Sequence, residues 1–212
     1  MKPKKDLLRK QRLYLIVDKK ISYNRNIPAM VARIKGSGAG IIQFRDKQSN
    51  KESIVKEALL LRKALSSTNT LFIVNDYLDV AKILNCDGLH LGQKDSSLGI
   101  ARKILGPDKI IGVSCHNLKQ ALKAQEEGAD YIGFGPVFPT TTKPRIKKTT
   151  GLNLMKKLKK RMKIPFFAIG GINKSNINEV LSSGTDKVAI CSAILKAKNI
   201  PSEINFFSKV LN

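Results

Sequence analysis

The chain has 212 residues, of which 42% are hydrophobic, and this is enough for one domain with a substantial core. No apolar run approaches the roughly 18 residues that a membrane-spanning helix needs, which argues against a membrane protein. The net charge of +23 suggests a polyanion partner such as nucleic acid. However, the cations are spread over every predicted helix without interleaved aromatic residues, so nucleic-acid binding is kept only as a non-enzymatic alternative.

Cysteine spacing and the first residues indicate a cytoplasmic protein. Cys86, Cys115 and Cys191 show no CxxC spacing and cannot all pair, which predicts reduced thiols and no zinc site. The basic segment 1–12 leads straight into a predicted strand, so we expect no signal peptide. We therefore predict a basic N-terminal lead-in over 1–12 and a single domain over 13–212.

Strand-like and helical segments alternate along the whole chain. The predicted strands are 13–17, 40–44, 71–74, 88–91, 109–113, 130–134, 164–169 and 187–190. The predicted helices are 27–34, 52–65, 78–84, 100–105, 118–127, 152–162, 175–181, 191–196 and 202–210. This alternation favours an α/β fold with a parallel sheet, and eight units favour a single (βα)8 TIM barrel. The alternative is an open doubly wound sheet, but no GxGxxG follows the first strand.

Two acids follow neighbouring strands in the stretch 71–95. Asp76 and Asp95, with Asn75 and Gln93 beside them, come directly after the strands 71–74 and 88–91. A right-handed βαβ crossover makes the two strands parallel, so both acids reach the same edge of the sheet. Such a pair can hold Mg²⁺, which completes its octahedron with water and substrate phosphate. Alternatively each Asp caps the following helix, but the pair together favours the metal site.

Polar residues at the end of the second predicted strand point to an anionic ligand. Gln43, Arg45 and Lys47 alternate, so their side chains lie on one side if the strand geometry persists. Cations beside two carboxylates indicate a metal-bound di- or triphosphate. The alternative is a solvated loop with exposed cations.

The fifth strand contributes a hydroxyl and a histidine of uncertain role. Ser114 ends this strand and is able to donate a hydrogen bond to a phosphate, whereas His116 suits a base, a helix start or packing equally well. No residue stands at the spacing of a catalytic triad. His90 lies inside a predicted strand and is expected to face the core or the barrel lumen.

A second anion site is predicted after the sixth, seventh and eighth strands. The loop 135–150 carries Thr140, Thr142 and Lys143 between Gly and Pro residues, which suits an anion cradle or a mobile lid. Gly170-Gly171 and Cys191-Ser192 end the last two strands, where barrels often bind phosphate. Two anion sites without an obvious nucleophile predict a transferase that stabilises a leaving group.

Seven motifs resemble the thiamine phosphate synthase family: QFRDK, VND, GLHLGQKD, GVSCHN, GFGPVFPTTTK, AIGGI and ICSAI. They occur in the family's order and spacing from about residue 13 to about residue 195. The resemblance implies a (βα)8 barrel that joins 4-amino-2-methyl-5-hydroxymethylpyrimidine diphosphate to 4-methyl-5-(2-phosphoethyl)thiazole. The products are thiamine phosphate and pyrophosphate, and Mg²⁺ is required.

The resemblance also assigns roles by position. Asp76 and Asp95 would be the Mg²⁺ ligands. The pyrimidine diphosphate would be held by Gln43, Arg45, Lys47, Asn75, Ser114 and Lys143, all but the first of which are the expected catalytic residues. The thiazole phosphate would be surrounded by Thr140, Thr142, Gly171, Cys191 and Ser192. The implied mechanism is dissociative: the C–O bond breaks before the thiazole nitrogen captures the pyrimidine carbocation.

The chain departs from the family's sequence pattern in three places, and one related barrel enzyme is a rival interpretation. Lys187 replaces a frequent glycine at the amino end of the last strand, Cys191 stands at a variable position, and the net charge is unusual. The nearest rival is the thiazole tautomerase, a related barrel without a diphosphate substrate. His116 does not discriminate between the two, but Asp76, Asp95 and Lys143 favour the synthase. The expected partners are small phosphorylated substrates, and the oligomeric state stays open.

Overall fold

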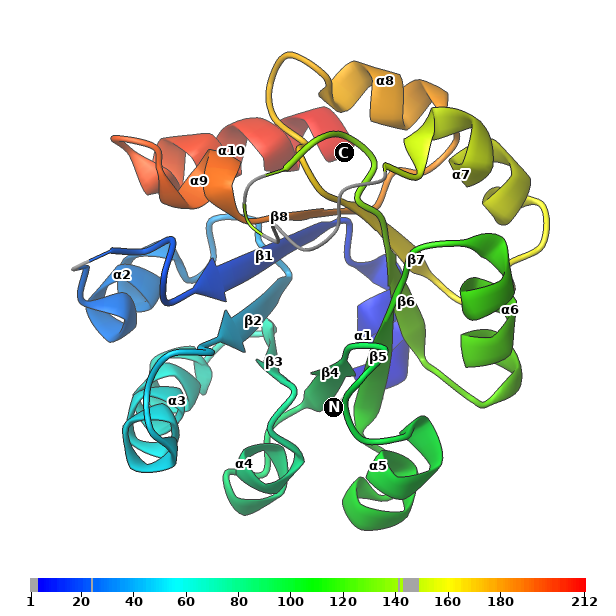
Figure 1. Cartoon of the computed structure of the whole chain (residues 1–212). Coiled ribbons are helices and arrows are strands. Elements are labelled where there is room, and N and C mark those ends of the chain that lie inside the picture. Colours follow the sequence, from blue (N-terminus) through cyan, green and yellow to red (C-terminus); the bar gives the residue numbers. More distant parts are fainter. Residues whose placement is uncertain (1–3, 24, 141, 143–148) are drawn as a thin grey trace.

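A computed structural model describes residues 4–23, 25–140, 142 and 149–212 as a closed barrel of parallel strands in the order β1 to β8 (Figure 1). The strands are β1 (Leu13–Asp18), β2 (Ile41–Arg45), β3 (Leu71–Asn75), β4 (Gly88–Leu91), β5 (Ile110–Cys115), β6 (Tyr131–Phe134), β7 (Phe166–Ile169) and β8 (Val188–Ile190). β8 pairs with β1 and closes the sheet. The predicted TIM barrel is thus confirmed and the open sheet was wrong.

Helices surround the barrel and connect successive strands (Figure 1). They are α1 (Lys4–Lys10), α2 (Ile27–Ile34), α3 (Lys51–Leu65), α4 (Leu78–Ile83), α5 (Leu98–Leu105), α6 (Leu118–Glu126), α7 (Gly151–Lys159), α8 (Ile177–Ser182), α9 (Ser192–Leu195) and α10 (Ile200–Leu211). Several begin at an Asn or Ser whose side chain accepts a backbone N–H three residues on, as Asn50 and Ser97 do. Within the described ranges, no helix has the length and hydrophobicity to cross a membrane.

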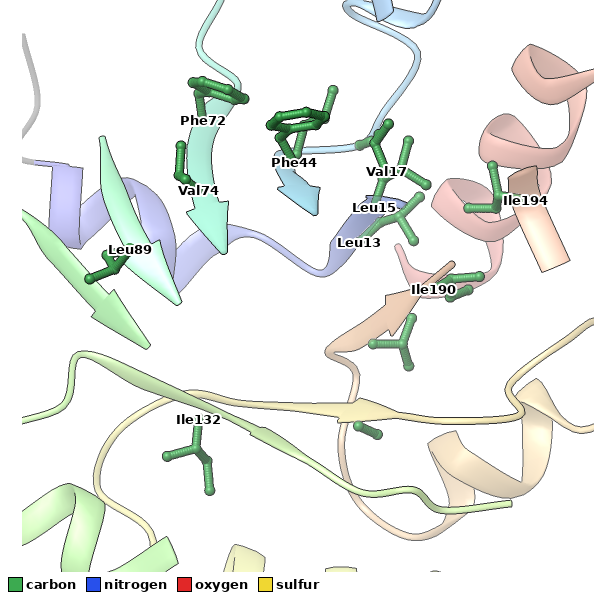
Figure 2. Packing of buried hydrophobic residues seen from close by; sticks show 14 of the residues in the cluster. Leu13, Leu15, Val17, Phe44, Phe72, Val74, Leu89, Ile132, Ile190 and Ile194 are labelled. Atoms are coloured by element: carbon green, nitrogen blue, oxygen red, sulfur yellow. The ribbon is translucent and has the colours of Figure 1, made fainter. Parts of the chain in front are cut away.

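The main hydrophobic core lies between the barrel strands and the helices. In β1 it takes the alternate residues Leu13, Leu15 and Val17, all nearly inaccessible to solvent, because successive side chains of a strand point to opposite faces (Figure 2). The helices supply the matching stripe; in α3 it includes Ile54 and Leu65. This outer core fixes the helices against the barrel and so fixes the loops at its carboxyl end.

A second, smaller core fills the inside of the barrel. It consists of the intervening strand residues, including Tyr14 and Tyr131, together with Leu8 from α1. Tyr14 packs edge-on against Phe167 with ring centroids 5.3 Å apart. The basic lead-in is thus helical over Lys4–Lys10, and the buried Leu8 side chain of this helix closes the amino end of the lumen.

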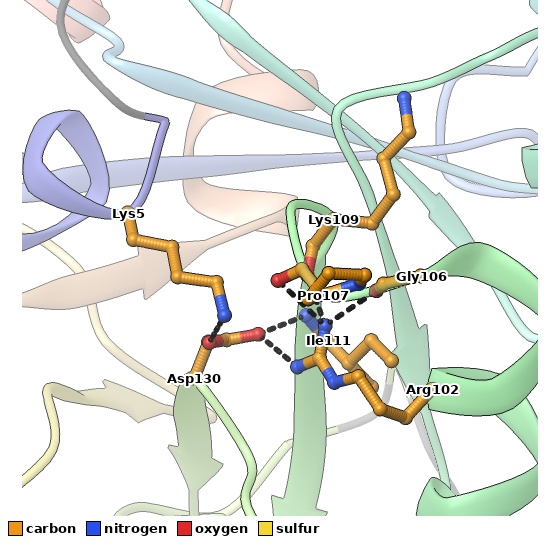
Figure 3. Close-up of polar contacts among 7 residues, drawn as sticks. All are labelled: Lys5, Arg102, Gly106, Pro107, Lys109, Ile111 and Asp130. Carbon is orange, nitrogen blue, oxygen red and sulfur yellow. Dashed lines mark hydrogen bonds and ion pairs between the residues drawn. The ribbon is translucent and has the colours of Figure 1, made fainter.

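Ion pairs at the amino end hold α1 against the barrel. The Asp130 carboxylate binds Lys5 at 2.9 Å and Arg102 at 2.5 Å, and it also accepts the Ile111 backbone N–H (Figure 3). Lys187 donates to the backbone oxygens of Arg9 and Gln11 at the same end. Lys187 therefore lies at the amino end of the barrel, far from the carboxyl rim. Its departure from the family pattern has no bearing on the site there.

We predict that Leu8→Ala will lower the free energy of unfolding by about 2–3 kcal/mol, because it removes buried apolar contacts at the base of the lumen. The steady-state activity should be retained, since the carboxyl rim is untouched. Urea unfolding measures the change, and Lys10→Ala, on an exposed position of the same helix, is the matched control with an expected change below about 0.5 kcal/mol. An unchanged midpoint for Leu8→Ala would show that α1 does not contribute to the core.

Candidate active site

A cavity of about 910 Å³, its open mouth included, lies at the carboxyl ends of the strands. This is the end of a parallel barrel where the strand-to-helix loops converge. The residues predicted from sequence that line it are Gln43, Arg45, Ser114, Thr140, Thr142, Gly171, Cys191 and Ser192. They come from five different strand ends, so the barrel brings together side chains that are far apart in the sequence.

Arg45 is held in the cavity wall by Asp18, the last residue of β1. The two residues are in register on neighbouring strands, and their ion pair is largely buried, with side-chain exposures of 15% for Arg45 and 3% for Asp18. Asp18 also accepts the Ile21 backbone N–H at 3.1 Å. Among the described residues, Arg45 Nε has no hydrogen-bond partner although it is buried. The guanidinium is thus rigidly placed and retains donor capacity beside the cavity.

Two carboxylates and a lysine form a cluster beside the cavity. Lys47 Nζ lies 2.7 Å from an Asp76 carboxylate oxygen, and the Asp95 carboxyl is close enough to interact with Asp76. Burial chiefly, and then the hydrogen bond and like charge of Asp95, raise the pKa of Asp76 above its ordinary value, while Lys47 opposes this shift. The fold therefore holds two acids together against their repulsion, as a cation site requires.

Neither acid caps the helix that follows it, so the capping interpretation was wrong. α4 has no side-chain cap, and its N-cap residue is Tyr77, while α5 is capped by Ser97. Asp76 instead adopts φ +64°, a left-handed conformation that is uncommon outside glycine. Asp95 accepts the Gly92 backbone N–H at 2.7 Å. Local backbone geometry thus directs both carboxylates to the rim.

Asn75 and Gln93 flank this cluster and connect it to the barrel. Asn75 ends β3 and is 4% exposed. Within the described part of the chain its Nδ2 has no hydrogen-bond partner, which leaves a buried donor available beside Asp76. Gln93 Nε2 donates to the backbone oxygen of Ser114 at 2.6 Å and ties the loop after β4 to the end of β5.

The opposite side of the cavity is rich in glycine and hydroxyl groups. Gly171 has φ +67°, and a Cβ there would lie 2.5 Å from the Pro139 backbone oxygen. Only glycine lets the loop after β7 pack so closely against the loop that carries Thr140 and Thr142. α8 begins only at Ile177, so its N-terminus does not follow directly on the glycine pair. Lys143, predicted to bind the diphosphate, lies outside the described residues.

Both histidines have structural hydrogen bonds, and neither forms part of a triad. His116 Nδ1 lies 2.6 Å from the Gly135 backbone oxygen, so this nitrogen donates. His90 faces the lumen, as expected, with Nδ1 2.9 Å from the Tyr131 hydroxyl and Nε2 2.9 Å from Ser114 Oγ. The described lining of the cavity thus offers the Arg45 cation, hydroxyls and backbone groups as possible ligand contacts.

Two groups of predicted residues are therefore distinguishable. One group lines the cavity. The other group lies outside that lining and consists of Lys47, Asn75, Asp76 and Asp95. Sequence reasoning missed the buried partners of the predicted residues. Asp18 pairs with Arg45, and Tyr14 and Tyr131 extend the hydrogen bond of Gln43. Asp18 ends β1 much as Asp76 and Asp95 follow β3 and β4, and this shared position was the available signal.

Comparison with known proteins decides the relationship. A family model described as thiamine monophosphate synthase matches residues 13–194. The chain belongs to this family. A thiamine-phosphate synthase of Lawsonia intracellularis (strain PHE/MN1-00) is 42% identical over 192 residues, covering 91% of this chain and 88% of the relative. One of Shouchella clausii (strain KSM-K16) is 40% identical over 189 residues, with 89% and 90% covered.

Solved structures agree with the thiamine monophosphate synthase assignment. A thiamine phosphate pyrophosphorylase from Pyrococcus furiosus superposes with a TM-score of 0.86 and 35% identity over 97% of both chains. The (S)-3-O-geranylgeranylglyceryl phosphate synthase of Thermoplasma acidophilum, at 15% identity and a TM-score of 0.72, shares the fold alone. Family membership places the chain among the transferases of thiamine biosynthesis.

Proposed function

We propose that this protein joins 4-amino-2-methyl-5-hydroxymethylpyrimidine diphosphate to 4-methyl-5-(2-phosphoethyl)thiazole and releases pyrophosphate. The observation that carries the proposal is the cluster of Asp76, Asp95 and Lys47 beside the cavity that holds Arg45. Thiamine-phosphate synthases about 40% identical over nine tenths of the chain support it.

The carboxylate pair fits a magnesium site. The buried Asp76 and the adjacent Asp95 provide hard oxygen ligands, and burial, followed by the hydrogen bond to Asp95, raises the pKa of Asp76 above its ordinary value. Mg²⁺ bound there would neutralise charge on the diphosphate. Lys47 already contacts Asp76, so it is placed to share the diphosphate oxygens with that site.

The remaining contacts to the pyrimidine diphosphate come from both sides of the carboxylate cluster. Arg45 and Ser114 offer donors from the cavity wall, and Asn75 offers its unpartnered Nδ2. We assign Gln43 to the pyrimidine, because its side chain lies deeper, in the lumen. Lys143 completes this set by position in the family motif.

We assign the thiazole phosphate to the glycine-rich side of the cavity. Thr140, Thr142 and Ser192 bring hydroxyls there, and Gly171 brings a backbone that can approach a phosphate closely. Cys191 stands in the same wall. Among the described residues that line this side there is no carboxylate, which suits a phosphate monoester.

The chain's own groups suit a dissociative reaction. Arg45, Lys47, Asn75 and Ser114 would stabilise the charge that grows on the diphosphate as the C–O bond breaks, and this lowers the barrier more than it aids binding. The thiazole nitrogen then attacks the pyrimidine carbocation. No general base is needed at this step, in keeping with the structural hydrogen bonds of His90 and His116.

The two other functions receive less support. A thiazole tautomerase needs no pair of acids, and here the fold strains Asp76 into φ +64° beside Asp95. A polyanion-binding protein has no need of a deep cavity lined by mixed donors.

We also propose a cytoplasmic location. Cys86, Cys115 and Cys191, all of them described, form no disulfide, which is consistent with reduced thiols.

The deciding experiment measures thiamine phosphate formation from the two purified substrates, with Mg²⁺ and with excess EDTA. We expect product with Mg²⁺ and a loss of at least about 10²-fold with EDTA, because the diphosphate charge is then uncompensated. Reactions that lack one substrate are the controls. Absence of product from the folded protein would contradict the proposal, and equal rates in EDTA would remove the metal site.

A further inference from the structure

A continuous chain of hydrogen bonds crosses the barrel lumen at the floor of the cavity, which all of its residues line. Gln43 Nε2 donates to the Tyr14 hydroxyl at 2.7 Å, and that hydroxyl lies 2.8 Å from the Tyr131 hydroxyl. Tyr131 continues to His90 Nδ1 at 2.9 Å, and His90 Nε2 reaches Ser114 Oγ at 2.9 Å. We name these five residues the lumen chain. It connects the residue assigned to the pyrimidine with one assigned to the diphosphate.

The lumen chain is shielded from water and built with close steric complementarity. All five members are buried; Tyr131 has no exposed surface and Ser114, the most exposed, has 8%. A Cβ at position 112 would lie 2.0 Å from the Tyr131 ring, so Gly112 is what allows this ring to cross the lumen. Burial raises the pKa of both tyrosines well above the ordinary phenol value, which keeps both hydroxyls protonated.

Each link has one proton, so a single donor at one end sets the direction of all the others. An amide nitrogen can only donate, so the Tyr14 hydroxyl accepts from Gln43. Its own buried proton is then paired only if Tyr14 donates to Tyr131. Tyr131 then donates to His90 Nδ1, and His90 must carry its proton on Nε2. This proton goes to Ser114 Oγ. The Ser114 hydroxyl proton is therefore not used within the lumen chain.

We propose that Tyr14, Tyr131 and His90 are positioning residues that orient Ser114 so that its hydroxyl proton is directed into the cavity. The identity of the acceptor rests on the proposed function: the Ser114 hydroxyl donates to a diphosphate oxygen whose negative charge grows in the transition state. If the Gln43 amide were turned by 180°, every donor would reverse. Ser114 would then donate to His90 and would have no proton for the ligand.

The tautomer of His90 reports this direction in the unmodified protein. The chain has two histidines, so ¹⁵N-histidine labelling gives two sets of ring signals, and His116→Asn assigns them. We expect Nε2–H for His90 and Nδ1–H for His116, whose Nδ1 donates to the Gly135 oxygen. His90 in the Nδ1–H form would overturn the proposal. This measurement requires no catalysis, so it is independent of whether the proposed function holds.

A double-mutant cycle tests whether Tyr131 acts through Ser114. We expect Tyr131→Phe to lower kcat about tenfold with KM changed less than about twofold, because the fold persists but the orientation of Ser114 is lost. In a Ser114→Ala background the same change should have almost no further effect. Tyr23→Phe, on a tyrosine that is 66% exposed, is the matched control.

Independent losses from Tyr131→Phe and Ser114→Ala would contradict the proposal, since two separate roles multiply their effects on kcat. If Tyr131→Phe does not fold, the His90 tautomer still decides the question. An Nε2–H His90 in a protein that forms no thiamine phosphate would uphold the orientation and remove the proposed function. An Nδ1–H His90 in a fully active protein would remove the orientation proposal and leave the proposed function in place.

Discussion

Asp76→Asn is expected to lower thiamine phosphate formation by at least about 10³-fold, and Asp95→Asn should do the same. Each change removes a charged oxygen ligand from the pair that we assign to Mg²⁺, at the position where diphosphate charge develops. Asn is isosteric and tolerates the left-handed conformation of Asp76. Steady-state rates at several Mg²⁺ concentrations measure the effect.

Stability should respond in the opposite sense to activity. The raised pKa of Asp76 means that the folded state binds its proton more tightly than the unfolded chain, so the ionised carboxylate destabilises the fold at neutral pH. Asp76→Asn should therefore leave the urea midpoint unchanged or raise it. Asp79→Asn, nearby on α4 and 43% exposed, is the matched control with near-normal turnover. Near-normal activity in Asp76→Asn or Asp95→Asn would exclude the metal site.

Arg45→Met is expected to lower turnover by about 10³-fold and stability by about 3 kcal/mol. Turnover falls because a rigid, multiply donating cation leaves the cavity wall. Stability falls because the Asp18 carboxylate, with only 3% of its side chain exposed, loses its charge partner. Steady-state kinetics and urea unfolding measure the two effects separately.

The double change Asp18→Asn with Arg45→Met separates the two roles of the arginine. Removing the uncompensated charge at position 18 should restore most of the stability. Activity should not return, because the cation is still missing from the cavity. If the double variant regained activity, Arg45 would serve only to hold the end of β1, and its assignment to the diphosphate would be wrong.

The barrel and the acid pair were predictable because both follow from local patterns. Alternating strand and helix segments specify a parallel sheet, and one crossover places the ends of β3 and β4 on the same edge, with Asp76 and Asp95 just beyond them. The carboxyl-end cavity then brings Gln43, Arg45 and Ser114 together, as expected. These inferences needed only the direction of each strand.

The side-chain partners were not predictable, because they depend on register across distant strands. Arg45 meets Asp18 only because β1 and β2 pair in one particular alignment. Tyr14 meets Tyr131 across the lumen, 117 residues apart in sequence, and both look like ordinary core residues in a strand pattern. Helix ends were also uncertain: the helix predicted over 152–162 ends at Lys159. The alternative that Asp76 and Asp95 cap α4 and α5 was wrong for a different reason: the N-cap positions fall on Tyr77 and Ser97, and the sequence does not specify the backbone angles that decide this.

The filled lumen leaves the cavity accessible from the carboxyl end of the barrel. Tyr14, Tyr131 and Phe167 form the floor of the cavity within the barrel, and Leu8 fills the lumen further toward its amino end. Substrates and products must therefore pass through the same opening at the carboxyl end. Under the proposed function, a ligand that contacts Gln43 on the floor of the cavity therefore shares its route to solvent with any ligand bound nearer the mouth.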